Sequence, residues 1–548
     1  MLNREKFVGI MTGVAGMMQL TLTEFMLDTY YEMFKDYEDE RFKKAIFEVL
    51  KTNRYHTFPK PAEIEPLVNQ KEELKALLTS REISQFKPCP ARRFMVPKNE
   101  LSFRCATQLS LFDTIILTAI IHQYGEGIES RRPPKEEKRV FSYRYKPQAD
   151  YWLYDRDYDW TPFWRQCFER SKSHSHALVL DISDFYNQIY HHTIEHQLAE
   201  SNFPNSAIKW IMNLLESLTA KVSRGIPVGP YSAHLLAEAS LIPLDNSLKS
   251  HGIEFIRFVD DIVIFTDSAI DSRRQLNLVA DILDKQQRLI LNNAKTKILT
   301  RDQIQKHSKE MVEDRPINDL EKQILSIIRK YSAGNPYQVV LLSEISPEDL
   351  AEFRPEVLER IIKDYLSSEP TDFIRLRWFL RRLTQIGHPG AVKFCLQCLD
   401  SLTPALSDVC HYFLAASRSS SFDIPSLGKE LIIALDNELI KTNEYFQICI
   451  LSLFGRNPSF NHFPSLVKRF ESGSSFVKRE VILAGGYSSN TDWLRELKEQ
   501  YAGFDNWSQT AFLTAARVLP FEERCFFVKS LPTGNEFVEL LKKWTKLR

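Results

Sequence analysis

Three aspartates stand where apolar strands are expected to end, and they carry the clearest chemical signal in the chain. Asp181 follows an apolar run, and Asp260 and Asp261 lie between two apolar arms within residues 255–266. Short apolar runs of this kind, bounded by polar residues, are typical of buried strands. The sequence therefore predicts a β-hairpin whose turn carries two acids, with a third acid at the end of another strand.

These carboxylates suggest metal-assisted chemistry. Adjacent carboxylates repel each other unless a cation neutralises them. Mg²⁺ prefers such oxygen ligands and keeps coordination positions for water and phosphate oxygens. Two ions can activate an attacking hydroxyl and stabilise a leaving pyrophosphate. An ordinary surface turn is the alternative, since aspartate is common in turns, but the apolar flanks and the matching Asp181 favour a metal site.

The elements that must position these acids change in character along the chain. At 548 residues, the chain is long enough for several domains. Helical periodicity dominates residues 1–75, and short strands and helices with basic clusters fill 76–175. Strands alternate with helices in 176–305, and helical patterns punctuated by prolines continue through 306–548. The last segment is typical of stacked helix pairs, and we expect an α-helical repeat there.

Composition narrows the functional classes. The chain has 71 basic and 71 acidic residues, so it has no general electrostatic attraction for a long duplex. Its eight cysteines follow no disulfide pattern, which favours a cytoplasmic protein. No apolar run approaches the ~18–20 residues of a membrane span, so we expect no membrane association.

One basic and aromatic stretch has two interpretations. Residues 374–383 alternate arginines with bulky side chains around Trp378. They could line a channel for a single strand, with Trp378 stacking on bases. The alternative, which we favour, is a repeat helix with Trp378 and Leu380 in the core and the arginines in solvent.

Five blocks of sequence resemble reverse transcriptases, in the order of that family. Residues 176–190 resemble motif A, 224–238 motif B, 255–266 motif C and 289–299 motif D, while 93–104 resemble the fingers strands. The resemblance implies an α+β fold with a right-hand polymerase palm and fingers, followed by an all-α HEAT-like helical-repeat domain. We therefore divide the chain into a helical N-terminal segment (1–75), fingers (76–175), palm (176–305) and repeat domain (306–548).

The resemblance also implies the metal and the substrate. Asp181, Asp260 and Asp261 correspond to the catalytic metal-binding triad. They would hold two Mg²⁺ ions, or Mn²⁺ in their place, and act on deoxynucleoside triphosphates.

Five further residues correspond to nucleotide contacts of the family. Lys98 and Arg104 would bind the triphosphate through charge-assisted hydrogen bonds. Tyr186 matches the residue that packs against the sugar and disfavours a 2′-hydroxyl, and Gly229 would let the backbone approach the nucleotide. Lys295 matches a lysine that can protonate pyrophosphate, although a solvated lysine at a helix cap is an equal alternative.

One position departs from the family pattern. Val228 stands where many reverse transcriptases have a glutamine beside the nucleotide and the template. The side-chain amide contact is therefore missing, which puts templated fidelity in doubt.

A narrower resemblance is to the abortive-infection (AbiK-like) reverse transcriptases of antiphage defence. It rests on residues 184–192, on 141–145 and on the helical C-terminal half, with no thumb signature after residue 300. This resemblance implies a homo-oligomer that makes single-stranded DNA without a template and attaches it covalently to a protein hydroxyl. Such a role would fit abortive infection.

The first 75 residues have a weaker likeness to phage helicase-loader domains, carried by 7–11, 31–45 and 58–64. It implies contact with a phage replication protein, although a plain helical extension is an equal alternative. Tyr30, Tyr31 and Tyr37 lie in this segment and are candidate priming residues. Packing on amphipathic helices is the more ordinary role for each of them.

Two other functions compete with this interpretation. The first is a templated RNA-directed DNA polymerase of the retron or group II intron type. The second is a non-catalytic scaffold that senses phage proteins, which the complete set of three aspartates disfavours.

Overall fold

The computed structural model describes residues 58–59, 61–147, 153–313, 315–334, 338–419 and 422–547. They form two compact units. We call the described parts of 71–89 and 112–313 the sheet unit, and those of 58–70, 90–111 and 315–547 the helical unit. Tyr30, Tyr31 and Tyr37 lie outside the described residues, as does most of the predicted N-terminal segment.

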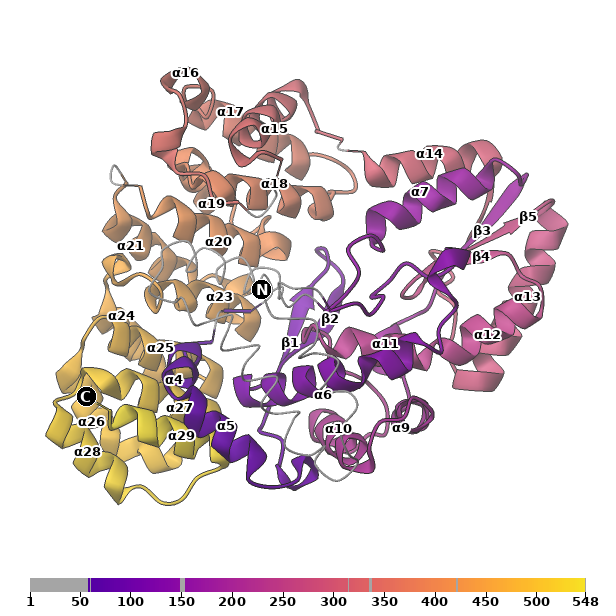
Figure 1. Ribbon diagram of the computed structural model, residues 1–548. Helices are drawn as coiled ribbons and strands as arrows, with labels where there is room; N and C mark the ends of the chain where they lie inside the picture. Colours follow the sequence, from indigo (N-terminus) through magenta and orange to yellow (C-terminus); the bar gives the residue numbers. More distant parts are fainter. Residues whose placement is uncertain are drawn as a thin grey trace, which may run out of the picture. The chain divides into compact units, whose positions relative to one another are not determined.

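A four-stranded antiparallel sheet organises the sheet unit (Figure 1). Its order is β4-β5-β3-β6, and the strands are β3 (His176–Asp181), β4 (Phe255–Phe258), β5 (Asp261–Thr266) and β6 (Lys297–Thr300). The strands β4 and β5 are consecutive and form the predicted hairpin. The central pairing of β3 with β5 runs from His176 opposite Thr266 to Asp181 opposite Asp261.

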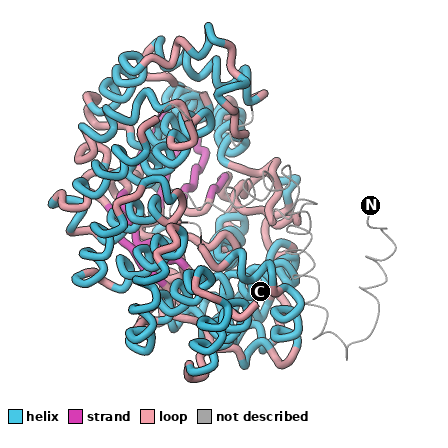
Figure 2. Tube along the Cα trace, turned by 90° about the vertical axis from the view of Figure 1, so that its left-hand side faces the viewer, coloured by secondary structure: helices cyan, strands magenta, loops and turns pink. Residues whose placement is uncertain are grey.

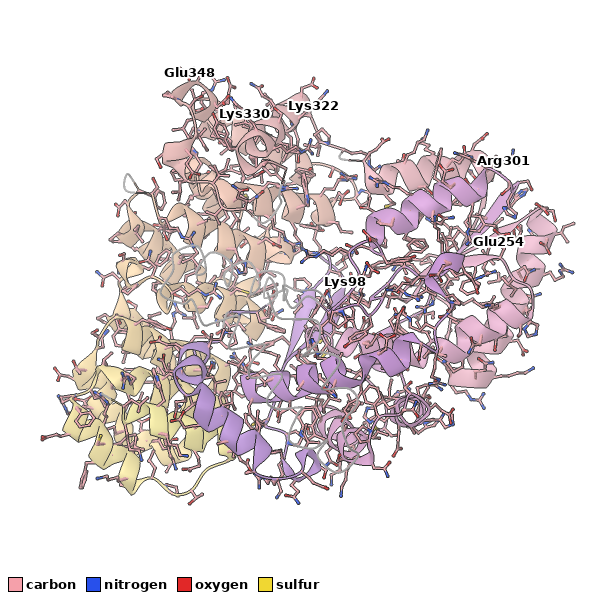
Figure 3. All side chains as sticks on the ribbon, in the orientation of Figure 1. Lys98, Glu254, Arg301, Lys322, Lys330 and Glu348 are labelled. Carbon is pink, nitrogen blue, oxygen red and sulfur yellow. The ribbon has the colours of Figure 1, made fainter. Side chains whose placement is uncertain are left out.

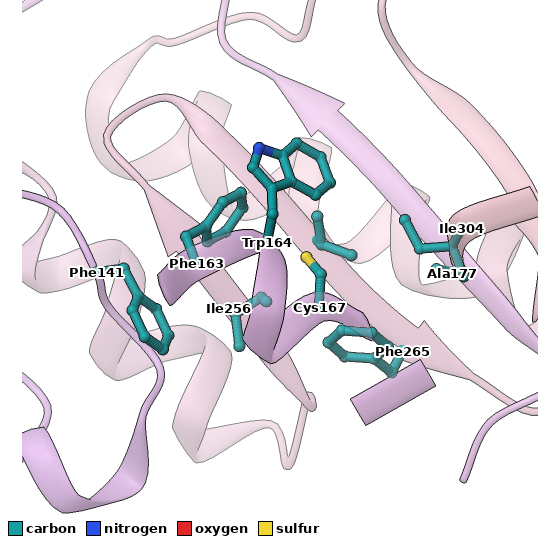
Figure 4. Close-up of a cluster of buried hydrophobic side chains, with 9 residues drawn as sticks. Phe141, Phe163, Trp164, Cys167, Ala177, Ile256, Phe265 and Ile304 are labelled. Carbon is teal, nitrogen blue, oxygen red and sulfur yellow. The ribbon is translucent and has the colours of Figure 1, made fainter. Parts of the chain in front are cut away.

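Helices cover both faces of this sheet. On one face α7 (Trp160–Ser171) and α14 (Arg301–Val312) pack together, and on the other lies α13 (Ala269–Gln287). Figure 4 shows the core under α7, where Phe163, Trp164 and Cys167 meet Ile256 and Phe265 of the hairpin. The unit's other α-helices are α5 (Lys71–Thr79), α6 (Leu111–Glu129), α8 (Phe185–Gln188), α9 (His191–Glu200), α10 (Asn205–Leu218), α11 (Ala233–Ser240) and α12 (Ile242–Ser250).

The helical unit contains a succession of helix pairs. One row is formed by α18 (Phe373–Ile386), α20 (Leu406–Ala416), α23 (Glu444–Phe454), α25 (Ser475–Tyr487), α27 (Asn506–Ala515) and α29 (Glu536–Thr545), each contacting the next. The intervening helices are α17 (Pro355–Leu366), α19 (Val392–Gln397), α21 (Ile424–Ala434), α22 (Glu438–Lys441), α24 (Phe463–Ser472), α26 (Thr491–Leu497) and α28 (Phe521–Ser530). Two more helices, α15 (Asp319–Ser332) and α16 (Pro347–Leu350), precede them. Figure 2 shows that most of the described chain is helix and loop, with few strands. The predicted fold class, α+β followed by an all-α helical repeat, is confirmed.

A second, two-stranded sheet belongs to the helical unit. The strands β1 (Arg92–Pro97) and β2 (Phe103–Gln108) pair antiparallel. The Phe94 ring packs against Phe476 at 4.9 Å, and Arg92 lies over the same ring and forms an ion pair of 3.4 Å with Glu480. The segment predicted as fingers is therefore divided: its hairpin belongs to the helical unit because its inner face is buried against the repeat helices.

A short helix that precedes the β1–β2 hairpin in the sequence is bonded, through Glu63, to the repeat helices α25 and α27. The helix α4 (Ile64–Asn69) follows Glu63, whose buried carboxylate forms an ion pair of 2.8 Å with Arg479. The carboxylate also accepts a hydrogen bond of 2.8 Å from Thr510 Oγ1. Burial alone would raise the pKa of Glu63, but Arg479 and these hydrogen bonds outweigh it and lower the pKa.

The stretch around Trp378 lies on α18. Leu380 is buried, as predicted for a repeat helix. Trp378 is half-buried, and the Arg382 guanidinium covers its ring at 4.6 Å. The proposed stacking on bases stays a prediction.

Close packing between helix pairs predicts the effect of one substitution. A Cβ added at Gly428 of α21 would lie 2.0 Å from the Phe460 carbonyl oxygen. Alanine favours a helix over glycine by about 1 kcal/mol, but overpacking costs about 1–3 kcal/mol. Because backbone cannot move aside easily, we expect the overpacking cost to dominate, so that Gly428→Ala lowers the free energy of unfolding by up to about 2 kcal/mol.

Thermal unfolding of the full chain measures the loss of stability expected for Gly428→Ala. Gly503→Ala is the matched control, because a Cβ at Gly503 meets nothing within 4 Å. Equal melting temperatures for the two variants would contradict the packing of α21.

Candidate active site

The three predicted aspartates lie together at one end of the central strands. Asp181 is the last residue of β3, and Asp261 is the first residue of β5 and its direct partner. Directly opposed residues of an antiparallel pair project to the same face, with Cβ atoms ~5 Å apart. Asp260 occupies the hairpin turn, where its carbonyl oxygen accepts a hydrogen bond of 3.2 Å from the Ile182 N–H.

The proximity of these acids changes the ionisation of one of them. Burial raises the pKa of Asp261, and the negative charges of Asp260 and Asp181 raise it further, to about 7. The Lys295 ammonium opposes this shift. Charge repulsion at the site is therefore only partly compensated by the protein.

Both oxygens of the Asp181 carboxylate have partners from one loop. Lys295 Nζ donates to Oδ2 at 2.5 Å, and Asn292 Nδ2 donates to Oδ1 at 3.1 Å. The Asn292 N–H also donates to the Asp181 carbonyl oxygen at 2.8 Å. Lys295 lies in the turn between α13 and β6, and burial and Asp181 shift its pKa in opposite directions, with a net rise.

The acids have the chemistry to hold a divalent cation. They supply hard oxygen ligands, and a cation would relieve the repulsion that raises the pKa of Asp261. Within the described ranges, no three His, Cys, Asp or Glu side chains are already grouped around a metal position. The Lys295 ammonium, 2.5 Å from Asp181 Oδ2, is a positive charge that the chain itself supplies to this site.

The hairpin turn is held in a conformation that its sequence does not favour. Val259 has a φ of +55°, which is strained for a β-branched residue. Its N–H donates to Ser142 Oγ at 2.9 Å, and its carbonyl accepts from Arg257 Nη1 at 3.0 Å. Two side-chain hydrogen bonds, one from Ser142 outside the hairpin and one from Arg257 of β4, therefore keep the turn, and with it Asp260, in place.

Those two partners belong to a buried ionic network. Arg257 is bonded to Asp245 at 2.6 and 2.8 Å and to Glu238 at 3.0 Å. Glu238 also pairs with Arg132 at 2.7 Å and accepts from Ser142 Oγ at 2.6 Å. Burial would raise the pKa of Glu238, but the two arginines outweigh it and lower the pKa.

The residues expected to contact the sugar lie beside the acids. Tyr186 follows β3 on α8, and its hydroxyl and His234 Nδ1 share a hydrogen bond of 2.7 Å. Burial raises the pKa of Tyr186 well above its usual value, and the nearby Tyr143, Glu238 and Asp260 raise it further. The Tyr186 carbonyl accepts from the Ile226 N–H at 2.9 Å, so the turn containing Gly229 is joined to this segment. Gly229 has a φ of +140°, a conformation suited to glycine.

The predicted phosphate ligands lie on the β1–β2 hairpin of the helical unit. Lys98 is exposed at its turn (Figure 3), and Arg104 pairs across the strands with Val96. Arg377 of α18 donates to the Pro97 and Lys98 carbonyl oxygens, each at 3.0 Å. The helical unit thus supports the backbone that carries Lys98.

Several residues of this site were missed from the sequence. Asn292, Ser142 and Arg257 position the acids, but only Arg257 gave a usable signal. It is a charge within the apolar run of β4, and Glu238 is similarly placed in α11. Charged residues are rarely fully buried without a partner, so the two could have been paired.

The pKa of Asp261 predicts how stability depends on pH. Its usual value is 3.8, and its value in the fold is about 7. Between these pH values the folded chain keeps a proton that the unfolded chain has lost, so stability falls as pH rises. In metal-free protein, we expect the free energy of unfolding of Asp261→Asn, relative to that of the parent, to rise by on the order of 4 kcal/mol from pH 4 to pH 8.

Thermal unfolding across this pH range measures the difference. Asp267→Asn, at an exposed acid just beyond β5, is the control and should follow the parent. A parent-to-Asp261→Asn difference that is independent of pH would show that Asp261 is not electrostatically strained.

A protein-family match spans the three acids. Residues 96–323 match the family described as reverse transcriptase (RNA-dependent DNA polymerase). A solved structure of telomerase from Candida albicans in complex with the TWJ fragment of telomeric RNA is similar over 81% of this chain and 71% of that chain. The identity is 11% and the TM-score is 0.31.

No curated protein matches the chain. Among the described helices, none has both the length and the apolar character needed to span a bilayer. The match of residues 96–323 to the reverse transcriptase family indicates an RNA-directed DNA polymerase-like nucleotidyltransferase.

Proposed function

We propose that the domain joins deoxynucleoside triphosphates into DNA by two-metal nucleotidyl transfer at Asp181, Asp260 and Asp261. The observation that carries this is the direct pairing of Asp181 with Asp261 next to the turn that contains Asp260. The three aspartates would hold two Mg²⁺ ions, or Mn²⁺ in their place, which would supply activation of the attacking hydroxyl and stabilisation of the leaving pyrophosphate.

The chain's own residues then bind and orient the nucleotide. In this proposal the Tyr186 ring packs against the sugar, and the Gly229 backbone lies along the nucleotide. Lys98 and Arg104 bind the triphosphate as charged donors. Lys295, whose ammonium lies 2.5 Å from Asp181 Oδ2, is close enough to the acids to give a proton to pyrophosphate.

Removing one metal-binding charge should abolish this activity. We expect Asp260→Asn to lower nucleotide incorporation with Mg²⁺ by at least on the order of 100-fold. The melting temperature should not fall, because the change removes a charge that repels Asp261. Incorporation of labelled dNTP by purified protein measures the effect, with Asp267→Asn as the charge-matched control. An Asp260→Asn variant as active as that control would refute the assignment.

We further propose that synthesis is untemplated and protein-primed. Val228 lacks the amide that commonly contacts the nucleotide and template, and the balanced charge offers no general hold on a duplex. A primer hydroxyl on the protein itself would have a high effective concentration at the acids. Tyr30, Tyr31 and Tyr37 stay candidates for this hydroxyl.

The biological role in this proposal is antiphage defence by abortive infection. It is supported by the likeness of residues 141–145 and 184–192 to AbiK-like enzymes and by the helical repeat that follows the polymerase domain. The partners are a phage replication protein, single-stranded DNA product and further copies of the chain. None of the eight cysteines, all of which are described, forms a disulfide, in keeping with a cytoplasmic setting.

A templated RNA-directed polymerase is the second candidate, because the matching family is described as RNA-dependent. A non-catalytic scaffold is the third, and the paired acids disfavour it. The product itself separates the first two candidates.

The test is to incubate nucleic-acid-free protein with labelled dNTP and Mg²⁺ and then denature it. Protein priming predicts label that migrates with the polypeptide and is lost from it after protease treatment. Replacing the priming tyrosine with phenylalanine should remove the label. The three candidates are tested one at a time, with the variants Tyr30→Phe, Tyr31→Phe and Tyr37→Phe. Label that requires an added RNA template and primer would favour the templated candidate.

A further inference from the structure

The Tyr186 hydroxyl is anchored to a single side chain. His234 Nδ1 lies 2.7 Å from it, and the two rings are nearly perpendicular, with centroids 5.8 Å apart. Both residues lie in the sheet unit, so their placement does not depend on the helical unit. A tyrosine that packs on a sugar with its ring faces alone would not need this bond.

His234 is itself held in one orientation. Its ring stacks on Tyr143 with centroids 4.1 Å apart and an interplanar angle of 2°, and its exposed fraction is 8%. The Tyr231 ring lies against it edge-on at 6.0 Å. These contacts restrict the imidazole, so the position of Nδ1 is set before any ligand binds.

The stacking partner is connected to the ionic network described above. Tyr143 has a φ of +42°, and its carbonyl oxygen accepts a hydrogen bond of 2.9 Å from Arg132 Nη1. Arg132 in turn pairs with Glu238, which supports the turn next to Asp260. The same charges therefore position both the acids and the Tyr143–His234 stack.

We propose that His234 is a positioning residue that determines how strictly the site excludes ribonucleotides. By holding the Tyr186 hydroxyl, it stops the phenol ring from tilting away from the space that a 2′-hydroxyl would enter. This inference rests on the proposed function, in which Tyr186 packs against the sugar. His234 acts through Tyr186 and does not touch the nucleotide.

The test compares kcat/KM for a ribonucleotide and for the matching deoxyribonucleotide, in full-length protein with Mg²⁺. His234→Phe keeps a ring to stack on Tyr143 but removes the hydrogen-bonding nitrogen. We expect it to raise the relative use of ribonucleotides about 2- to 10-fold, the factor that one neutral hydrogen bond supplies. His234→Asn keeps a polar group near the position of Nδ1 and should restore most of the discrimination.

Tyr186→Phe tests the same bond from its other end and keeps the aromatic ring. It should raise ribonucleotide use by the same factor as His234→Phe, and the double variant should give no further increase. A merely structural role of His234 would predict neither this non-additivity nor the rescue by asparagine.

Tyr186→Ala separates the inference from the proposed function. If it leaves the ribonucleotide ratio unchanged, Tyr186 does not contact the sugar, so the inference and the role given to Tyr186 in the proposed function both fail. If Tyr186→Ala raises the ratio while His234→Phe and Tyr186→Phe do not, only the positioning role of His234 is overturned. Equal increases in His234→Phe and His234→Asn would also overturn it, since the hydrogen bond would then not be the cause.

Discussion

Arg257 lies in the middle of an apolar strand, and its guanidinium is held by carboxylates from two different helices. It has no exposed surface, and neither do Glu238 and Asp245. Removing one partner from such a buried group leaves an uncompensated charge, at a cost of about 3–5 kcal/mol. The network therefore allows essentially one arrangement of β4, α11 and α12, and the hairpin turn at Val259 depends on that arrangement.

This constraint explains how an unfavourable group of acids can persist. The turn is strained at Val259, and burial, together with repulsion by Asp260 and Asp181, raises the pKa of Asp261 to about 7. Neither cost would be tolerated by an isolated hairpin, which is marginally stable at best. Strain and repulsion of this kind are often stored at functional sites. A bound cation would relieve the repulsion.

A second network has the corresponding role in the helical unit. Arg92 packs against Phe94, Phe476 and Trp507 and pairs with Glu480, while Arg479 pairs with Glu63. Residues that lie 388 and 416 positions apart in the sequence are thereby joined, at one pair of repeat helices. The consequence for function is that the hairpin with Lys98 and Arg104 is positioned by the repeats.

The sequence by itself determined the local features of this protein. The apolar runs around Asp181, Asp260 and Asp261 were sufficient to predict strands, hairpin and acidic turn, because alternation and length are properties of contiguous residues. Helical periodicity and prolines likewise predicted the C-terminal repeats. Only the tertiary structure decided which distant side chains meet. The Asn292 contact with Asp181, the His234 contact with Tyr186 and the burial of the β1–β2 hairpin against repeat helices each join segments far apart in sequence. The strand register and helix packing that bring such segments together are set by the whole core, and no local pattern of residues encodes them.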